Sequence, residues 1–290
     1  MTGVLLMAHG TPAALDEMAE YLTVVRGGRT PPPALVEEMT HNYAAIGGRS
    51  PLTDLTRAQG AALQARLGHD VPVDVGMRNW RPYINDAIAR LSGCGVERIV
   101  GIPLAPQFSA LSVQKYVDTA VGATPSSVQF EAIRSFHDHP LLLEAFAERV
   151  RAAQPQPDER VVFTAHSLPA RAIDGGDAYA KEVAATARGV AERSGITEYD
   201  FAYQSAGRTP EPWIGPALDD YIRERAAAGV RRFLIVPVGF VCDHTEILFD
   251  IYVQAMATAR AAGASLRRTE SLNTSPTFIA LLEDLVRRVL

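Results

Sequence analysis

The chain has few cysteines and no long apolar run. Its 290 residues include only Cys94 and Cys242. This excludes a disulfide framework of the small secreted type and a four-cysteine iron–sulfur cluster. No apolar run approaches the roughly 18 residues that a membrane-spanning helix needs, and no basic segment followed by an apolar stretch opens the chain. We therefore expect a soluble, cytoplasmic protein.

Dense basic clusters and phosphate-binding loops are also missing. The formal net charge is −5, and arginines come in isolated pairs such as Arg231-Arg232 and Arg267-Arg268, which argues against a nucleic-acid partner. Gly27-Gly28 and Gly47-Gly48 lack the strand-then-helix context of a nucleotide-binding loop. No Gly-x-Ser-x-Gly segment of the serine hydrolases occurs.

The chain does have a regular alternation of short apolar segments with amphipathic ones. Hydrophobic residues make up 47% and charged residues 21%, as in ordinary globular proteins. Strands are predicted at Val4–Met7, Val71–Gly76, Arg98–Pro103, Val128–Ile133, Val161–His166, Tyr199–Tyr203, Arg232–Val238 and Ser265–Glu270. Helical periodicity fills the segments between them, including Thr245–Ala262. This rhythm predicts an α/β fold with parallel strands and helices on both faces.

Two pairs of segments repeat along the chain. Val4–Pro12 matches Val161–Pro169, strand for strand and histidine for histidine, and Arg98–Pro103 matches Arg232–Pro237. Such internal similarity predicts two similar doubly wound, Rossmann-like halves that face each other across a cleft.

We expect the N-terminal half to comprise residues 1–110 with residues 270–290 as a returning helix, and the C-terminal half to comprise residues 111–269. Ligands bind beyond the carboxyl ends of parallel strands. His9 and His166 stand at such ends, where a histidine can move a proton near neutral pH or bind a metal. A histidine that merely caps the next helix is the alternative.

An acidic row follows the strand Arg232–Val238. Glu246, Asp250 and Gln254 are spaced i, i+4 and i+8, which places them on one face of the predicted helix, and Asp243 or Thr245 is available to cap its start. Two carboxylates and an amide can relay protons or hold a hydrated cation. A solvated helix face is the alternative, but the apolar residues around the row favour burial.

Five segments resemble the ferrochelatase family, in the family's order and across almost the whole chain. They are Ile46–Leu52, Met77–Pro82, Thr164–Pro169, Gln204–Trp213 and Gly239–Glu246. The resemblance implies a chelatase-like fold and a lyase that inserts ferrous iron into a porphyrin in haem biosynthesis. Iron is then a substrate, and no tightly bound cofactor is expected.

The resemblance also implies roles for individual residues. His166, Glu246 and Asp250 are the expected catalytic residues, and His166 and Glu246 are also expected to contact the iron. The porphyrin contacts that it implies are His9, Arg26, Ser50, Arg78, Tyr116, Ser205 and Trp213.

Arg26–Pro31 and Gln204–Trp213 are most similar to the monomeric bacterial branch that uses coproporphyrin III. This implies a monomer without membrane attachment, in transient contact at most with neighbouring haem-pathway enzymes. The chain departs from that branch at His9, where a tyrosine is usual, and at Gln254, where a third acidic residue is common.

Three other interpretations of the sequence stay open. The substrate would be protoporphyrin IX in another branch of the family. A cobalt or nickel chelatase for a reduced tetrapyrrole would use paired histidines, as the match between His9 and His166 suggests. A non-catalytic haem-binding or haem-delivery protein would use His9 as an axial ligand.

Overall fold

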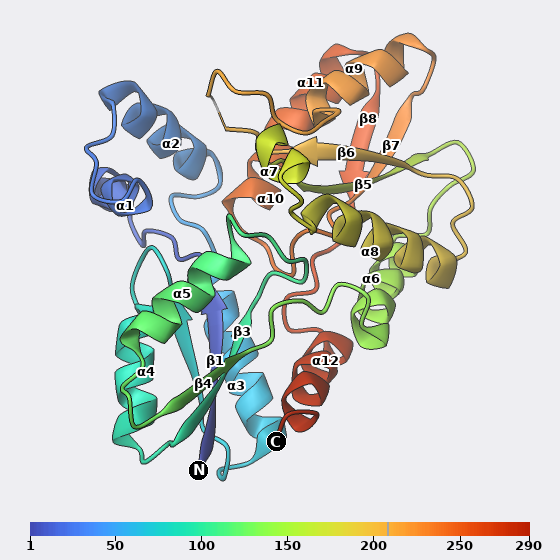
Figure 1. The fold of residues 1–290 in the computed structure, drawn as a ribbon. Helices are drawn as coiled ribbons and strands as arrows, with labels where there is room; N and C mark the ends of the chain where they lie inside the picture. The colour runs from blue at the N-terminus through green and yellow to red at the C-terminus, as the bar shows by residue number, and fades with distance from the viewer. Residues whose placement is uncertain (208) are drawn as a thin grey trace.

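The chain folds around two separate sheets in a computed structural model that describes residues 1–207 and 209–290. Arg208, within one of the segments that carry the family resemblance, lies outside the described residues. Figure 1 shows one sheet in the lower lobe and the other in the upper lobe. We call residues 2–132 the first half and residues 140–268 the second half.

The first sheet has four parallel strands in the order β2-β1-β3-β4. They are β1 (Thr2–Ala8), β2 (Val73–Met77), β3 (Arg98–Pro103) and β4 (Gln129–Ala132). In the interior strand β1, Val4 pairs with both Val73 and Val100 and is fully buried. Parallel strands covered on both faces are continuously apolar, which is why this strand is recognisable in the sequence.

The second sheet repeats the arrangement, with the order β6-β5-β7-β8. Its parallel strands are β5 (Arg160–His166), β6 (Asp200–Gln204), β7 (Arg232–Val236) and β8 (Ser265–Arg268). The strands β1 and β5 thus occupy equivalent positions, and so do β3 and β7. The predicted fold class, two similar doubly wound halves, is confirmed.

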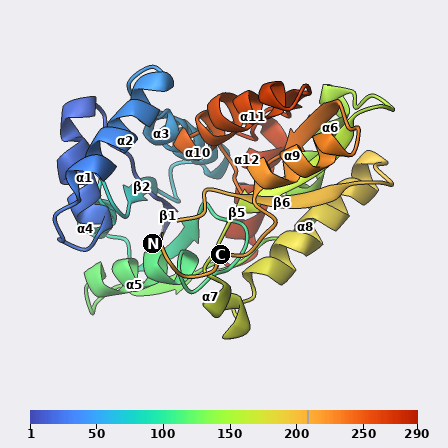
Figure 2. The ribbon, with the colours of Figure 1, turned by 90° about the horizontal axis from the view of Figure 1, so that it is seen from above.

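Helices connect the strands in both halves. Those of the first half are η1 (Leu15–Glu17), α1 (Met18–Val25), α2 (Pro33–Ala45), α3 (Leu52–Leu67), α4 (Ile84–Gly93) and α5 (Val113–Ala123). Those of the second half are α6 (Pro140–Ala153), α7 (Ala170–Asp174), α8 (Tyr179–Ser194), α9 (Leu218–Ala227), α10 (Thr245–Leu248), η2 (Asp250–Ala255) and α11 (Met256–Ala261). Figure 2 shows α1, α2 and α4 on one side and α6, α8 and α9 on the other.

The last helix joins the two halves. α12 (Pro276–Arg287) packs against both α3 and α6, and it lies beneath the second half in Figure 1. Its fully buried Phe278 belongs to one continuous apolar cluster with Leu6 of the first sheet and Phe163 of the second. The halves therefore share a core, which fixes the strand ends of one sheet relative to those of the other.

The structure differs from the sequence prediction at the boundary between the halves. β4 pairs with β3, so the first half continues past the division expected at residue 110. The hydrogen-bonded register decides the membership of this strand, and the exposed, partly polar sequence of Gln129–Ala132 carries no sign of it. No helix in the described residues is long and apolar enough to span a bilayer.

The segment Thr245–Ala262, predicted to be helical, is helical over most of its length but is not a single α-helix. A π-helical segment, η2, separates α10 from α11. The backbone N–H of Gln254 donates to the backbone carbonyl of Phe249, five residues earlier, at 2.9 Å. π-Helical segments often occur at functional sites, and this one begins at Asp250, itself a predicted catalytic residue.

Candidate active site

His166 and Glu246 meet at the carboxyl ends of two neighbouring strands. His166 ends β5, and Glu246 lies in α10, which follows β7. The His166 Nδ1 lies 2.9 Å from Glu246 Oε2, and the two side chains are 33% and 38% exposed. His166 is not a helix cap, because α7 begins after Pro169. The structure therefore brings together the two principal catalytic residues that the sequence predicts.

A glycine lets the two loops approach closely. A Cβ added to Gly239 would lie 2.7 Å from the Cβ of Ala165, the residue before His166. The Gly239 amide also donates to the Thr164 carbonyl at 3.2 Å. The segment that carries Glu246 is thus packed directly against the end of β5.

In this imidazole–carboxylate pair, each partner changes the pKa of the other. Burial works to lower the pKa of His166, but the charge of Glu246 and its hydrogen bond outweigh it, so this pKa is raised. Burial works to raise the pKa of Glu246, but His166 and His244 lower it to about 2. The carboxylate also holds Nδ1 of the imidazole, which leaves Nε2 for a substrate.

Asp250 provides a second carboxyl with a very different pKa. Burial and the charge of Glu246 raise the pKa of Asp250 to about 7. The hydroxyl of Ser205 donates to its carboxylate. Gln254 instead donates its amide to Asp219 and is exposed. The row predicted along one helix face thus consists of Glu246 and Asp250 alone, because the π-helical segment changes the spacing of side chains.

His9 follows the end of β1 in the first half. Its Nε2 lies 3.1 Å from the hydroxyl oxygen of Tyr21, and the Asn79 amide nitrogen lies 3.1–3.2 Å from both ring nitrogens. The residue as a whole is exposed, but the protein around its imidazole removes enough hydration to lower the pKa of His9 to about 4. The charge of Arg78 lowers this pKa further, while Glu246 opposes the shift. His9 is therefore a neutral imidazole at pH 7.

These electrostatic effects show that the strand ends of the two halves face a common region. The charges of Glu246 and His166, in the second half, both act on His9, in the first. Each histidine ends or follows the strand in the equivalent position of its sheet. The arrangement combines a neutral imidazole, an imidazole–carboxylate pair and a carboxyl that titrates near pH 7.

Comparison with known proteins identifies the family. A family model described as Ferrochelatase matches residues 1–290. The chain belongs to the ferrochelatase family. It is 41% identical to the Ferrochelatase of Deinococcus radiodurans, over 99% of this chain and 95% of that protein. It is 37% identical to the Coproporphyrin III ferrochelatase of Geobacillus kaustophilus, over 98% of this chain and 94% of that protein.

Solved structures show the same fold at low sequence identity. SirB from Bacillus subtilis with Fe³⁺ aligns with a TM-score of 0.59 and 14% identity, over 99% of this chain and 94% of that one. The family and the chelatase-like fold that the sequence predicts are therefore both confirmed.

Three residues of the site were missed by reasoning from the sequence. Tyr21 and Asn79 hold His9, and the signal for Asn79 was its place in Met77–Pro82, directly after β2. His244 lies with Nδ1 at 3.0 Å from the Cys242 carbonyl oxygen and Nε2 at 4.0 Å from Glu246 Oε2. Burial lowers the pKa of His244, so a neutral imidazole lies beside the Glu246 carboxylate.

The structure places three predicted porphyrin contacts near these groups. The Trp213 ring lies edge-on to His166, with the ring centroids 6.5 Å apart. Burial raises the pKa of Tyr116, on which the charges of Arg78 and Glu246 also act. No carboxylate of the described residues lies within ion-pair distance of Arg78, so this cation is available to an anionic ligand.

Two predicted contacts, Ser50 and Arg26, make no hydrogen bond to the histidines within the described residues. Ser50 is buried at the start of α3, where its hydroxyl accepts from the Leu52 amide at 3.4 Å. Arg26 follows α1, and its Nε is buried without a hydrogen-bond partner there. Their roles in binding a porphyrin stay predictions.

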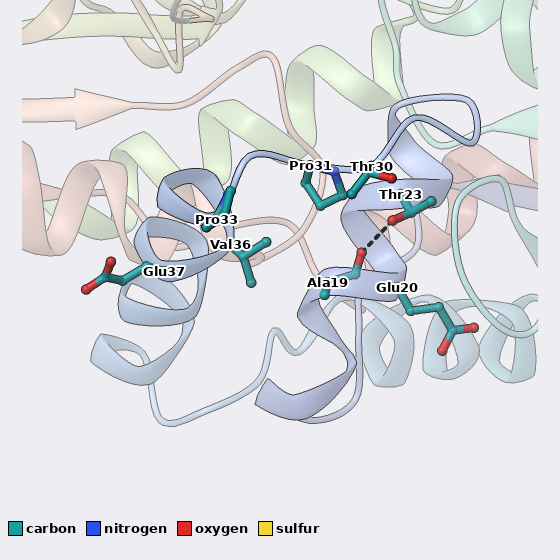
Figure 3. Close-up of a pocket in the computed structure, with 8 residues that line it drawn as sticks. All are labelled: Ala19, Glu20, Thr23, Thr30, Pro31, Pro33, Val36 and Glu37. Carbon is teal, nitrogen blue, oxygen red and sulfur yellow. Dashed lines mark hydrogen bonds between the residues drawn. The ribbon is translucent and has the colours of Figure 1, made fainter.

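No three-residue metal centre marks the site within the described residues. Among residues 1–207 and 209–290, no three His, Cys, Asp or Glu side chains form a group suited to a metal ion. A cavity of about 590 Å³ lies between α1 and α2, and Figure 3 shows its lining, which includes Glu20, Pro31 and Val36. No predicted site residue lines it, so we place the chemistry at the strand ends.

Proposed function

We propose that this chain inserts ferrous iron into a porphyrin. The observation that supports this most strongly is the hydrogen-bonded pair of His166 and Glu246 at the carboxyl ends of β5 and β7, within electrostatic reach of His9. A free-base porphyrin carries two pyrrole N–H protons, and both must leave as Fe²⁺ binds the four nitrogens. The site supplies groups for both tasks, because neutral imidazoles suit Fe²⁺ and carboxylates suit its hydrated form.

In this proposal His166 faces the centre of the ring. Glu246 accepts a hydrogen bond from Nδ1, so that Nε2 of the neutral imidazole takes a pyrrole proton or transiently binds the iron. The raised pKa of His166 makes it a stronger base. Asp250, with a pKa of about 7, passes protons on towards solvent. Binding energy elsewhere on the ring supplies the cost of bending it.

We propose coproporphyrin III as the substrate. Its four propionates require cations, and Arg78 has no carboxylate partner among the described residues. A 37% identical relative is named a coproporphyrin III ferrochelatase. Monomeric, cytoplasmic action, lyase chemistry without a bound cofactor and transient contact with neighbouring haem-pathway enzymes are parts of the proposal that follow from the family resemblance.

The test is an anaerobic assay with ferrous iron and, separately, coproporphyrin III and protoporphyrin IX. Product absorbance should appear with many turnovers, and faster with coproporphyrin III. Faster turnover of protoporphyrin IX would overturn the choice of porphyrin. Insertion of cobalt or nickel into a reduced tetrapyrrole alone would favour another chelatase. Stoichiometric binding of ready-made haem without turnover would indicate a carrier.

A further inference from the structure

The segment between β8 and α12 holds the turn that precedes Glu246. Asn273 and Asp243 exchange two hydrogen bonds: the Asp243 amide donates to Asn273 Oδ1 at 2.9 Å, and Asn273 Nδ2 donates to Asp243 Oδ2 at 3.0 Å. The backbone N–H of Asn273 also donates to the Val241 carbonyl at 2.9 Å. Asn273 has φ of 48°, a left-handed conformation that asparagine tolerates better than most residues.

The other carboxylate oxygen of Asp243 is bound by the last residue of β8, Arg268, and by Ser271 of the segment that follows. It accepts from Arg268 Nη2 at 2.7 Å and from the Ser271 hydroxyl at 2.8 Å. The Arg268 side chain is only 6% exposed. Asp243, which the sequence suggested as a helix cap, therefore anchors its turn to residues 268–273 instead, and α10 starts after His244 without a side-chain cap.

Glu246 is held at a second point by the second sheet. The Gln204 amide donates to the Glu246 carbonyl at 2.7 Å, and the Thr164 hydroxyl donates to Gln204 Oε1 at 3.0 Å. Only two residues lie between Asp243 and Glu246. The direction of its side chain towards His166 therefore depends on both attachments.

The first half contacts the same anchor. Gln59, in α3, is fully buried, and its Nε2 donates to the Asn273 carbonyl at 2.8 Å. A buried amide is costly without a hydrogen bond, and Oε1 of Gln59 has none within the described residues. Within the described residues, the side chain of Gln59 therefore makes its hydrogen bond to the Asn273 carbonyl, in the segment that connects β8 to α12.

We propose that Asn273 is a positioning residue for iron insertion. It fixes Glu246 against His166 through the Asp243 turn, and Gln59 couples this turn to the first half, which carries His9. The proposal rests on the proposed function of the chain, and it adds that the first half helps to set the geometry of the catalytic pair in the second.

The test compares Asn273→Gly and Gln59→Leu with Gln64→Leu. Glycine accepts the left-handed conformation but removes both side-chain bonds to Asp243. We expect kcat for iron insertion to fall about 10- to 100-fold in Asn273→Gly, since a small misplacement of a catalytic group costs that much. KM for the porphyrin should change less than about twofold, because the ring-binding surfaces stay in place. A smaller fall in the same direction is expected for Gln59→Leu.

Gln64→Leu is the matched control. Gln64 lies in the same helix, and its amide donates to the carbonyls of Gly68 at 2.6 Å and Val71 at 3.1 Å, both within the first half. Its loss should lower the melting temperature and leave kcat unchanged. Equal falls in kcat for Gln64→Leu and Gln59→Leu would overturn the proposal.

A readout independent of turnover is the pKa of His166, measured by NMR in the substrate-free protein. Displacement of Glu246 should lower this pKa in Asn273→Gly, and to a lesser extent in Gln59→Leu, but not in Gln64→Leu. An unchanged His166 pKa in the folded Asn273→Gly or Gln59→Leu variant would contradict the positioning role. If the wild type inserts no iron, the proposed function fails, while this titration still decides the role of Asn273.

Discussion

His166 Nδ1 and Glu246 Oε2 lie 2.9 Å apart, although 80 residues separate them in the chain. His166 is the last residue of the interior strand β5, and Glu246 lies in the helix α10, which follows the interior strand β7. The strands β5 and β7 are hydrogen-bonded neighbours. The contact therefore follows from the topology of the second sheet. It also makes each residue's protonation depend on the other, which leads to the first prediction.

Glu246→Gln removes the negative charge and keeps the size of the side chain. We expect the pKa of His166 to fall, because the charge of Glu246 is what raises it against burial. Iron insertion should slow by about 10²- to 10⁴-fold, the usual effect of losing an acid–base group, while porphyrin binding persists. NMR titration and anaerobic kinetics measure the two effects. An unchanged His166 pKa would show that the pair does not form in solution.

Asp250→Asn should change the pH dependence of the rate. The carboxyl must be ionised to accept a proton, so the wild-type rate should rise with pH through about 7, the pKa of Asp250. The variant should be about 10- to 100-fold slower, and its rate should not rise with pH near 7. If the rate of Asp250→Asn still rises with pH near 7, the titration seen in the wild type belongs to another group.

The same carboxyl should lower stability at high pH. Its pKa is about 7 in the folded protein, against 3.8 for an unperturbed aspartate such as that of the unfolded chain, so the folded state binds the proton more tightly. Stability is then fully present below pH 3.8 and is lost as the pH rises towards 7. Asp250→Asn should accordingly melt at a higher temperature than the wild type at pH 8 and at a similar temperature near pH 4.

Gly239→Ala should disturb the site through packing alone. The added methyl group would meet Ala165 at 2.7 Å, and overpacking of this kind costs about 1–3 kcal/mol. The matched control is Gly122→Ala in α5, where an added Cβ meets nothing within 4 Å. Alanine should stabilise that helix by about 0.5–1 kcal/mol. Urea denaturation measures both, and equal effects at the two positions would contradict the close approach.

The sheets could be predicted because their interior strands are buried on both faces. Val4–Met7 and Val161–Thr164 are apolar or β-branched throughout, and their match along the chain predicted two similar halves. The structure adds that the two sheets have the same strand order. β4 could not be assigned to a half, because a short, exposed edge strand carries no sign of its partner. Its membership depends on hydrogen bonds to β3.

Part of the site could be predicted, because functional residues of parallel sheets gather at the carboxyl ends of the strands. His9, His166 and Glu246 all stand after buried strands, and the family resemblance assigned their roles. The π-helical segment could not be foreseen, because the spacing of Glu246, Asp250 and Gln254 fits an α-helix equally well. The residues that hold His9 come from other elements, so only the tertiary structure identifies Tyr21 as one of them.

His9 provides a neutral imidazole that can bind the iron of the product. Its pKa of about 4 leaves the ring unprotonated at pH 7. We predict that His9→Ala changes the visible absorbance of bound ferric product. Tyr21→Phe is the control, because it removes only the hydroxyl 3.1 Å from Nε2 and should leave the spectrum close to that of the wild type. Identical spectra for the wild type and His9→Ala would exclude His9 as a ligand.

The most direct test of the account is iron insertion by His166→Ala under anaerobic conditions, with porphyrin binding measured on the same sample. We predict that the variant still binds coproporphyrin III and inserts no ferrous iron, since it lacks the imidazole that Glu246 orients. Near-normal turnover by the purified variant would contradict the central claim.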